Sequence, residues 1–97
     1  MQQDNKLMRA LLVELGKREA TLQEGDTIVV QPGIDANGGM HVEFPLRVQG
    51  YDHLQIDAHL RFLVRSGLIE SNVRDFPLIG IYFSRITKAG RRYMQPG

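Results

Sequence analysis

The chain begins with apolar residues at helical spacing. Asp4 is a residue type that caps helix N-termini, and an apolar stripe with a 3.6-residue period follows it. We expect Gly16 to end this helix. Residues 17–25 are polar and irregular, and Leu22 is expected to anchor them. The members of the stripe are Leu7, Met8, Leu11, Leu12 and Leu15.

Two short segments with strand patterns come next. Residues 27–30 form a β-branched run, and residues 40–44 alternate apolar and polar side chains. The stretch 32–39 between them is rich in residues that accept turn geometry, so we expect a hairpin with a mobile tip. Pro45 cannot donate to a β-ladder, so the second strand is expected to lie at an edge or to end there.

A second amphipathic helix is expected at residues 52–66. Asp52 and Gln55 have the spacing of a capping box. Gly67 suits the left-handed position after a helix, and the two apolar residues behind it, Leu68 and Ile69, are expected to re-enter the core. The residues expected on the inward side of this helix are Ile56, Leu60, Leu63 and Val64.

The last third of the chain predicts a strand and a short helix. Residues 70–75 form a polar break, and an apolar strand pattern covers residues 79–86. Thr87 is expected to cap a final helix. That helix carries Ala89, Tyr93 and Met94, with Arg91 and Arg92 on its surface.

These elements predict an α+β fold with a small antiparallel sheet. Their order is helix, strand, strand, helix, one or two strands, and helix. A chain of 97 residues has room for one hydrophobic core, so we expect a single domain over residues 1–97.

Composition removes several kinds of chemistry. The chain is 42% hydrophobic and 24% charged, which is typical of a globular protein. Its apolar runs are far shorter than the roughly 20 residues that cross a bilayer, and it opens without a secretory signal pattern, so we expect a cytoplasmic protein without membrane contact. With no cysteine, disulfides, cysteine-ligated zinc, iron–sulfur clusters and thiol nucleophiles are excluded.

Charge is distributed unevenly along the chain. Residues 1–60 carry five Lys/Arg against nine Asp/Glu, a net −4, whereas residues 61–97 carry seven against two, a net +5. A basic end can meet phosphates. The alternative is a solvated surface, or an intramolecular match to the acidic half.

Two motifs resemble winged-helix regulators. Residues 56–69 resemble the helix that ends there in Leu-x-x-x-Gly-Leu-Ile. Leucines one turn apart bury that helix, the glycine turns the chain, and the Leu-Ile pair starts the wing strand. Residues 86–90, Ile-Thr-Lys-Ala-Gly, resemble the Leu-Thr-x-x-Gly step that closes the wing.

Most of the chain also resembles a family of short, phage-associated bacterial proteins of unknown function. The resemblance rests on residues 4–12, Gly50-Tyr51, His59-Leu60 and residues 87–90, and it omits residues 24–45. It implies a winged-helix-like domain. There is one departure: DNA binders with this fold place a separate helix before the recognition helix, a position that an extended segment at residues 44–50 takes here.

The resemblance and the charge lead to a candidate nucleic-acid site. We expect a transcription-regulator-like protein that binds double-stranded DNA through the helix at residues 52–66 and a basic wing, as a homodimer. Asp57 works against this use because a carboxylate repels phosphates. The alternative is a protein–protein interaction or assembly module on a degenerate winged-helix scaffold. The candidate nucleic-acid contacts are His53, Gln55, Arg61, Arg65, Arg74, Arg85, Arg91 and Arg92.

Patterns for catalysis are incomplete. His41-x-Glu43 matches half of a zinc deaminase signature, but a cysteine-free chain lacks the other half. His53 and His59 are six residues apart and fall on different helix faces, so we expect no metal site that uses both. The glycine-rich residues 33–39 lack the Gly-Lys-Ser/Thr ending of a phosphate cradle. We therefore expect no enzyme and no cofactor, and a packed His59 hydrogen-bonded to backbone.

Overall fold

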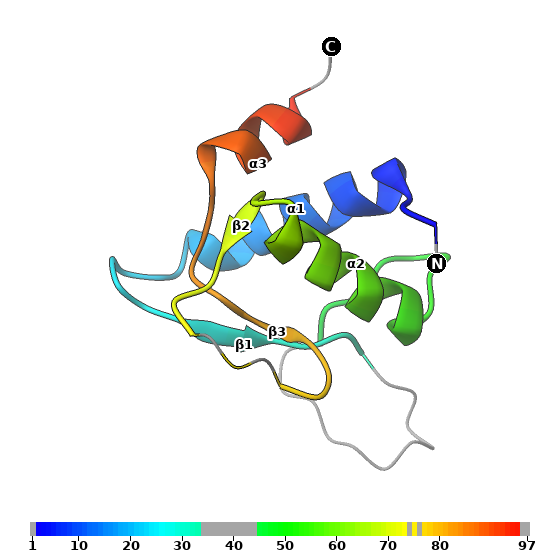
Figure 1. Cartoon of the computed structure of the whole chain (residues 1–97), viewed down its shortest axis with the longest axis horizontal. Helices are drawn as coiled ribbons and strands as arrows, with labels where there is room; N and C mark the ends of the chain where they lie inside the picture. Colours follow the sequence, from blue (N-terminus) through cyan, green and yellow to red (C-terminus); the bar gives the residue numbers. More distant parts are fainter. Residues whose placement is uncertain (1, 34–44, 74, 76, 96–97) are drawn as a thin grey trace.

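The computed structural model describes residues 2–33, 45–73, 75 and 77–95. Three helices and two small antiparallel sheets make up this part of the chain, which confirms the α+β class (Figure 1). The strand predicted at residues 40–44 and most of the predicted hairpin tip lie outside the described residues. The elements are α1 (Asn5–Glu19), β1 (Ile28–Val30), α2 (His53–Arg65), β2 (Ile69–Glu70), β3 (Ile81–Phe83), β4 (Arg85–Ile86) and α3 (Lys88–Met94).

Helix α1 begins where the sequence predicts and ends later. The Asp4 carboxylate accepts a hydrogen bond from the Leu7 N–H at 3.1 Å, and the five residues of the apolar stripe are all buried. The prediction that Gly16 ends the helix is wrong, because α1 continues to Glu19. The Glu19 carboxylate accepts from the backbone N–H of Ile86 at 3.2 Å. This contact with β4 exists only because α1 continues past Gly16, and a glycine inside a helix costs only about 1 kcal/mol.

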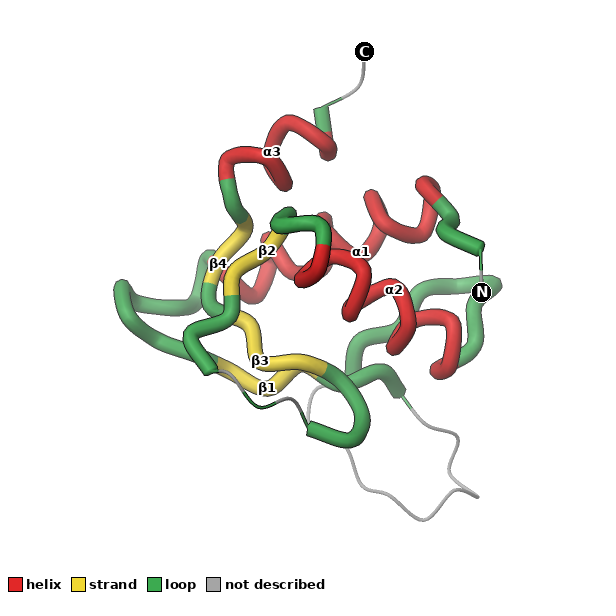
Figure 2. The backbone as a smooth tube through the Cα atoms, viewed as in Figure 1, coloured by secondary structure: helices red, strands yellow, loops and turns green. Residues whose placement is uncertain are grey.

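The strand predicted at residues 79–86 is divided between two sheets. β3 pairs antiparallel with β1, with Val29 opposite Tyr82. β4 pairs antiparallel with β2 (Figure 2). Ser84 is the one residue between β3 and β4 in the chain. This segment therefore has β1 as its partner before Ser84 and β2 after it.

Helix α2 has both of its predicted ends. The Asp52 side chain accepts from the Gln55 N–H at 2.8 Å, and the Gln55 side chain accepts from the Asp52 N–H at 2.9 Å, which completes the capping box. At the other end, Gly67 has a φ of 74°. The N–H of Leu68 donates to the Leu63 carbonyl at 3.0 Å, as in a Schellman turn.

The inward side of α2 is buried as predicted, with Val64 half-buried at its margin. Leu68 and Ile69 do re-enter the core. Before α2, the described residues 45–52 contain no helix, and Leu46 forms a parallel bridge with Pro32. The fully buried side chains of α2 are Ile56, His59, Leu60 and Leu63.

Thr87 both caps helix α3 and joins it to the turn after α2. The Thr87 hydroxyl accepts from the Gly90 N–H at 3.1 Å and donates to the Gly67 carbonyl at 2.6 Å. Gly90 is buried, and a Cβ at this position would lie 2.1 Å from the Leu68 carbonyl oxygen. A glycine is therefore required for α3 to approach the end of α2 this closely. Tyr93 and Met94 are half-buried against the core, as is Leu22.

One hydrophobic cluster joins the three helices and both sheets. It contains the α1 stripe, the inward side of α2 and the inward residues of the strands. No helix in the described part of the chain has the length and apolar character needed to cross a membrane.

Candidate binding surface

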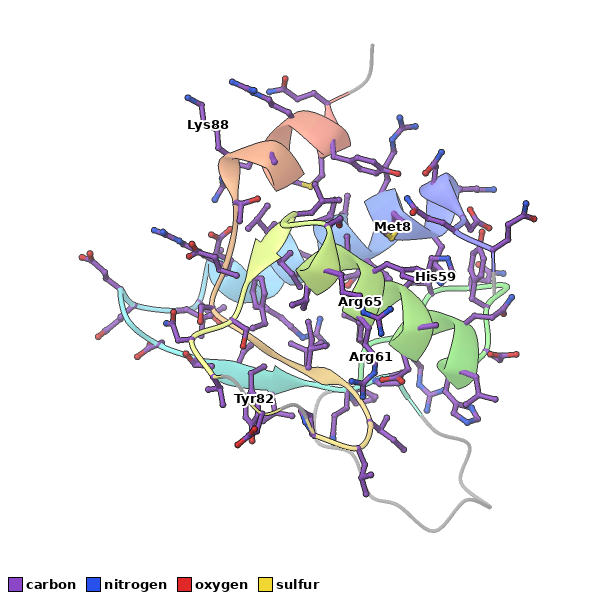
Figure 3. The ribbon with its side chains drawn as sticks, in the orientation of Figure 1. Met8, His59, Arg61, Arg65, Tyr82 and Lys88 are labelled. Atoms are coloured by element: carbon purple, nitrogen blue, oxygen red, sulfur yellow. The ribbon has the colours of Figure 1, made fainter. Side chains whose placement is uncertain are left out.

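Four residues of α2 lie opposite its buried side, at helical spacing. Together with the loop at residues 77–80, they form what we call the helix–loop surface. Figure 3 shows Arg61 and Arg65 projecting from the helix. The four helix residues are Leu54, Ala58, Arg61 and Arg65.

Arg61 and Asp57 join α2 to this loop. The Arg61 Nε donates to the Asp57 carboxylate at 3.2 Å, and its Nη2 donates to the carbonyls of Pro77 and Leu78, both at 3.0 Å. The other oxygen of Asp57 accepts from the Gly80 N–H at 2.6 Å. The two side chains are only 25% and 21% exposed. Arg61 therefore holds the loop against the helix and neutralises Asp57.

The other predicted nucleic-acid contacts on α2 differ in whether their side chains are exposed and unpaired. Gln55 is engaged in the capping box. His53 is half-buried in the first turn. Arg65 is exposed and has no ion pair or hydrogen bond with any described residue.

Of the four predicted contacts beyond α2, two are paired with carboxylates. Arg85 pairs with Glu70, and this hydrogen bond holds the pKa of Glu70 below its ordinary value and raises the pKa of Arg85. Arg91 donates to both oxygens of Glu19, at 3.0 and 2.9 Å. Arg92 is exposed without such a partner within the described residues, and Arg74 lies outside them.

Sequence reasoning missed further available cations on α1 and α3. The signal was present in α3, whose sequence KAGRRYM contains three cations and no acid. Within the described residues, the carboxylates without an ion pair or hydrogen bond are Glu24 and Asp75. The corresponding cations are more numerous: Lys6, Arg9, Arg47, Arg65, Lys88 and Arg92.

His59 has a structural position, as predicted. Its Nε2 accepts from the Asp4 backbone N–H at 2.9 Å, and its Nδ1 lies 2.7 Å from the Gln55 carbonyl. Because a carbonyl can only accept, Nδ1 carries the proton. Both nitrogens are thus satisfied. Across the described ranges, no group of three or more His, Cys, Asp or Glu could hold a metal ion.

Comparisons with protein-family models, with curated proteins and with solved structures found no match to this chain. Its function is therefore inferred from its own residues.

Proposed function

We propose that this chain is a non-enzymatic DNA-binding module on a winged-helix-like scaffold. α2 enters the major groove, and the loop between β2 and β3 acts as the wing. The observation that carries the proposal is the fixed helix–loop unit, in which Asp57 and Arg61 tie residues 77–80 to α2. A major groove about 12 Å wide accepts a helix, and a rigid neighbouring loop can then contact the flanking backbone.

The strand pairing supports this scaffold. In the winged-helix regulators that residues 56–69 and 86–90 resemble, the Leu-Ile pair starts the wing strand and the Leu-Thr-x-x-Gly step closes the wing. Here β4 pairs with β2 and β3 pairs with β1, both antiparallel. The described residues 45–52 lack the helix that usually precedes a recognition helix, so α2 would dock without it.

The charge of Asp57 no longer opposes contact with phosphates. Arg61 compensates it, and its second oxygen accepts from a backbone N–H. The helix–loop surface then offers Arg65, an exposed guanidinium that can bind a phosphate or a guanine edge in bidentate fashion.

Fluorescence anisotropy with a labelled random duplex tests the proposal. We expect the affinity to fall as salt is raised from about 50 to about 200 mM. Protein cations displace counterions from the DNA, and added salt opposes this release. The slope of log K against log salt is negative, and Arg65→Gln should make it shallower by about 0.9. Lys17→Gln is the control, since Lys17 is paired with Glu14 on α1. Binding that is absent at low salt would reject a DNA-binding role.

A protein-interaction module is the second candidate, because two leucines are conspicuously exposed on the helix–loop surface. Leu54 is 63% exposed and Leu78 is 96% exposed. Exposed apolar side chains on α2 and on the loop beside it are suited to a protein partner, here a second copy of the chain. Light scattering after size exclusion should then show a dimer that Leu78→Glu converts to a monomer. A monomeric wild-type protein would exclude this candidate.

A further inference from the structure

The helix–loop surface alone supplies little positive charge. It carries two arginines: Arg61 is paired with Asp57, and Arg65 has no ion pair among the described residues. DNA carries one negative charge per roughly 1.7 Å of its axis, so a stable complex needs several cations. Other unpaired cations lie on α1 and α3. We define the α1–α3 surface by Lys6, Arg9, Lys88 and Arg92.

Contacts at both ends hold α3 along α1 (Figure 1). From the middle of α3, Arg91 binds Glu19, the last residue of α1. Near its end, the Tyr93 hydroxyl donates to Asn5 at 2.6 Å. The two helices run in opposite directions (Figure 1), and the contact of Arg9 with Tyr93 brings this cation of α1 to the end of α3 that carries Arg92.

The Tyr93 ring holds the Arg9 guanidinium in place before any ligand binds. Its guanidinium carbon lies 5.6 Å from the centre of the Tyr93 ring, a cation–π distance. The ring is itself fixed by the hydrogen bond to Asn5. Arg9 is thus exposed while its side chain has less freedom to lose on binding.

Two of the three carboxylates of α1 and its cap are already paired with lysine or arginine. Glu19 is bound by Arg91 and by the N–H of Ile86. Asp4 accepts from Leu7 and Tyr51, and Glu14 is paired with Lys17. Asp4 keeps its negative charge because both of its donors are neutral, but none of the four cations of the α1–α3 surface forms an ion pair with a carboxylate among the described residues.

We propose that the α1–α3 surface binds the phosphate backbone of nucleic acid, as a second contact besides the helix–loop surface. The choice of nucleic acid rests on the proposed function. Lys88 and Arg92 are four residues apart on α3 and so share one face about 6 Å apart along the axis, as successive anionic groups require. Lys88 points away from the molecule in Figure 3. Arg9 and Arg92 supply forked donors that match phosphate oxygens.

The test compares two double variants that each remove two positive charges. Lys88→Gln/Arg92→Gln alters the α1–α3 surface, whereas Lys17→Gln/Arg47→Gln removes exposed cations elsewhere. In anisotropy titrations with a random duplex, the first variant should make the negative slope of log K against log salt shallower by about 1.8. The control should leave the slope close to that of wild type. Equal effects of the two variants would overturn the proposal, because they would reflect net charge alone.

Arg65→Gln separates this inference from the proposed function. If the salt slope becomes shallower in Lys88→Gln/Arg92→Gln but does not change in Arg65→Gln, the result supports DNA contact by the α1–α3 surface and rejects docking of α2. The reverse result rejects the α1–α3 surface and retains the proposed function. Binding to phosphatidylglycerol vesicles that is tighter than binding to the duplex assigns the surface to lipid and overturns the proposal.

Tyr93 variants test how Arg9 is positioned. Tyr93→Phe keeps the ring beneath Arg9, whereas Tyr93→Leu removes it. We expect the leucine variant to bind the duplex about two- to fivefold more weakly than the phenylalanine variant at constant salt. The salt slope should be the same, because no charge changes. Equal affinity of the two variants would show that the ring does not position Arg9 for binding.

Discussion

Asp4 joins three segments of the chain through its carboxylate and its backbone N–H. Its carboxylate accepts from the N–H of Leu7 at 3.1 Å and from the hydroxyl of Tyr51 at 2.9 Å, and its N–H donates to His59 at 2.9 Å. The two donors hold the pKa of Asp4 below its ordinary value, and the carboxylate raises the pKa of Tyr51. The start of α1 is thereby attached both to α2 and to the residues that precede it.

Tyr51→Phe should change how stability depends on pH. Because the folded pKa of Asp4 is lowered, its contribution is present above the unfolded pKa and is lost as pH falls below about 4. Because the folded pKa of Tyr51 is raised, its contribution is present below the unfolded pKa and is lost as pH rises above about 10.

Urea unfolding at a series of pH values measures this effect. The difference in midpoint between wild type and Tyr51→Phe should be largest near neutral pH and should shrink at both extremes. A difference that stays constant from acid to alkaline pH would mean that the bond to Asp4 contributes nothing to stability.

His59→Leu should destabilise the fold although leucine is apolar and of suitable size. The Asp4 N–H would lose its acceptor in a site where His59 is 2% exposed, at a cost of about 1–3 kcal/mol. Val13→Ala, on the exposed side of α1, is the control and should change the free energy of unfolding by less than about 0.5 kcal/mol. If both variants unfold at the same urea concentration, the hydrogen bonds of His59 have no net effect.

Three glycines shape the helices in different ways. Gly67 turns the chain with a positive φ, and Gly90 lets α3 approach the end of α2. Gly16 does neither, since a Cβ there would meet Ile86 at an ordinary contact distance of 3.6 Å. Gly16 and Gly67 look alike in the sequence, as glycines at the end of an apolar helix, and only the structure distinguishes them.

Alanine substitutions should therefore give three different results. Gly16→Ala should stabilise the protein by about 0.5–1 kcal/mol, because alanine is the better helix former. Gly67→Ala should destabilise it by about 1–2 kcal/mol, because the left-handed conformation strains a Cβ. Gly90→Ala should be the most harmful, because its Cβ would overlap the Leu68 carbonyl. Urea midpoints rank the three variants, and a destabilising Gly16→Ala would contradict this account.

Local signals in the sequence predicted the elements well. The caps Asp4, Asp52 and Thr87 all act within three residues, so their hydrogen bonds follow from spacing. The contacts that were missed are distant in the chain. Arg61 and Arg91 resemble surface arginines in the sequence, because their acceptors lie 16 and 72 residues away. The change of strand partner at Ser84 likewise depends on segments that meet only after folding.

The two sheets and three helices share structural members. The chain from β3 to β4 belongs to both sheets, α1 contacts α2, α3 and β4, and one hydrophobic cluster runs through all of them. No subset of the described elements has a separate core. We therefore expect the single domain predicted from the sequence to unfold as one cooperative unit.

The tyrosines provide a direct test of this cooperativity. Tyr51 precedes α2, Tyr82 lies on β3 and Tyr93 lies on α3, and the chain contains no tryptophan. Unfolding curves from tyrosine fluorescence and from far-ultraviolet circular dichroism should coincide. An earlier fluorescence transition that disappears in Tyr93→Phe would show that α3 detaches first and that unfolding is not two-state.

The carboxylate of Glu19 also fixes the rotational phase of α1. It reaches both β4 and α3 from the last residue of the helix, three residues beyond Gly16. One residue inserted between Gly16 and Glu19 would turn this side chain by about 100° around the helix axis and advance it by about 1.5 Å. Length changes in this chain are therefore tolerated poorly near the end of α1, where a single added residue would remove the Glu19 hydrogen bonds to β4 and to α3 at once.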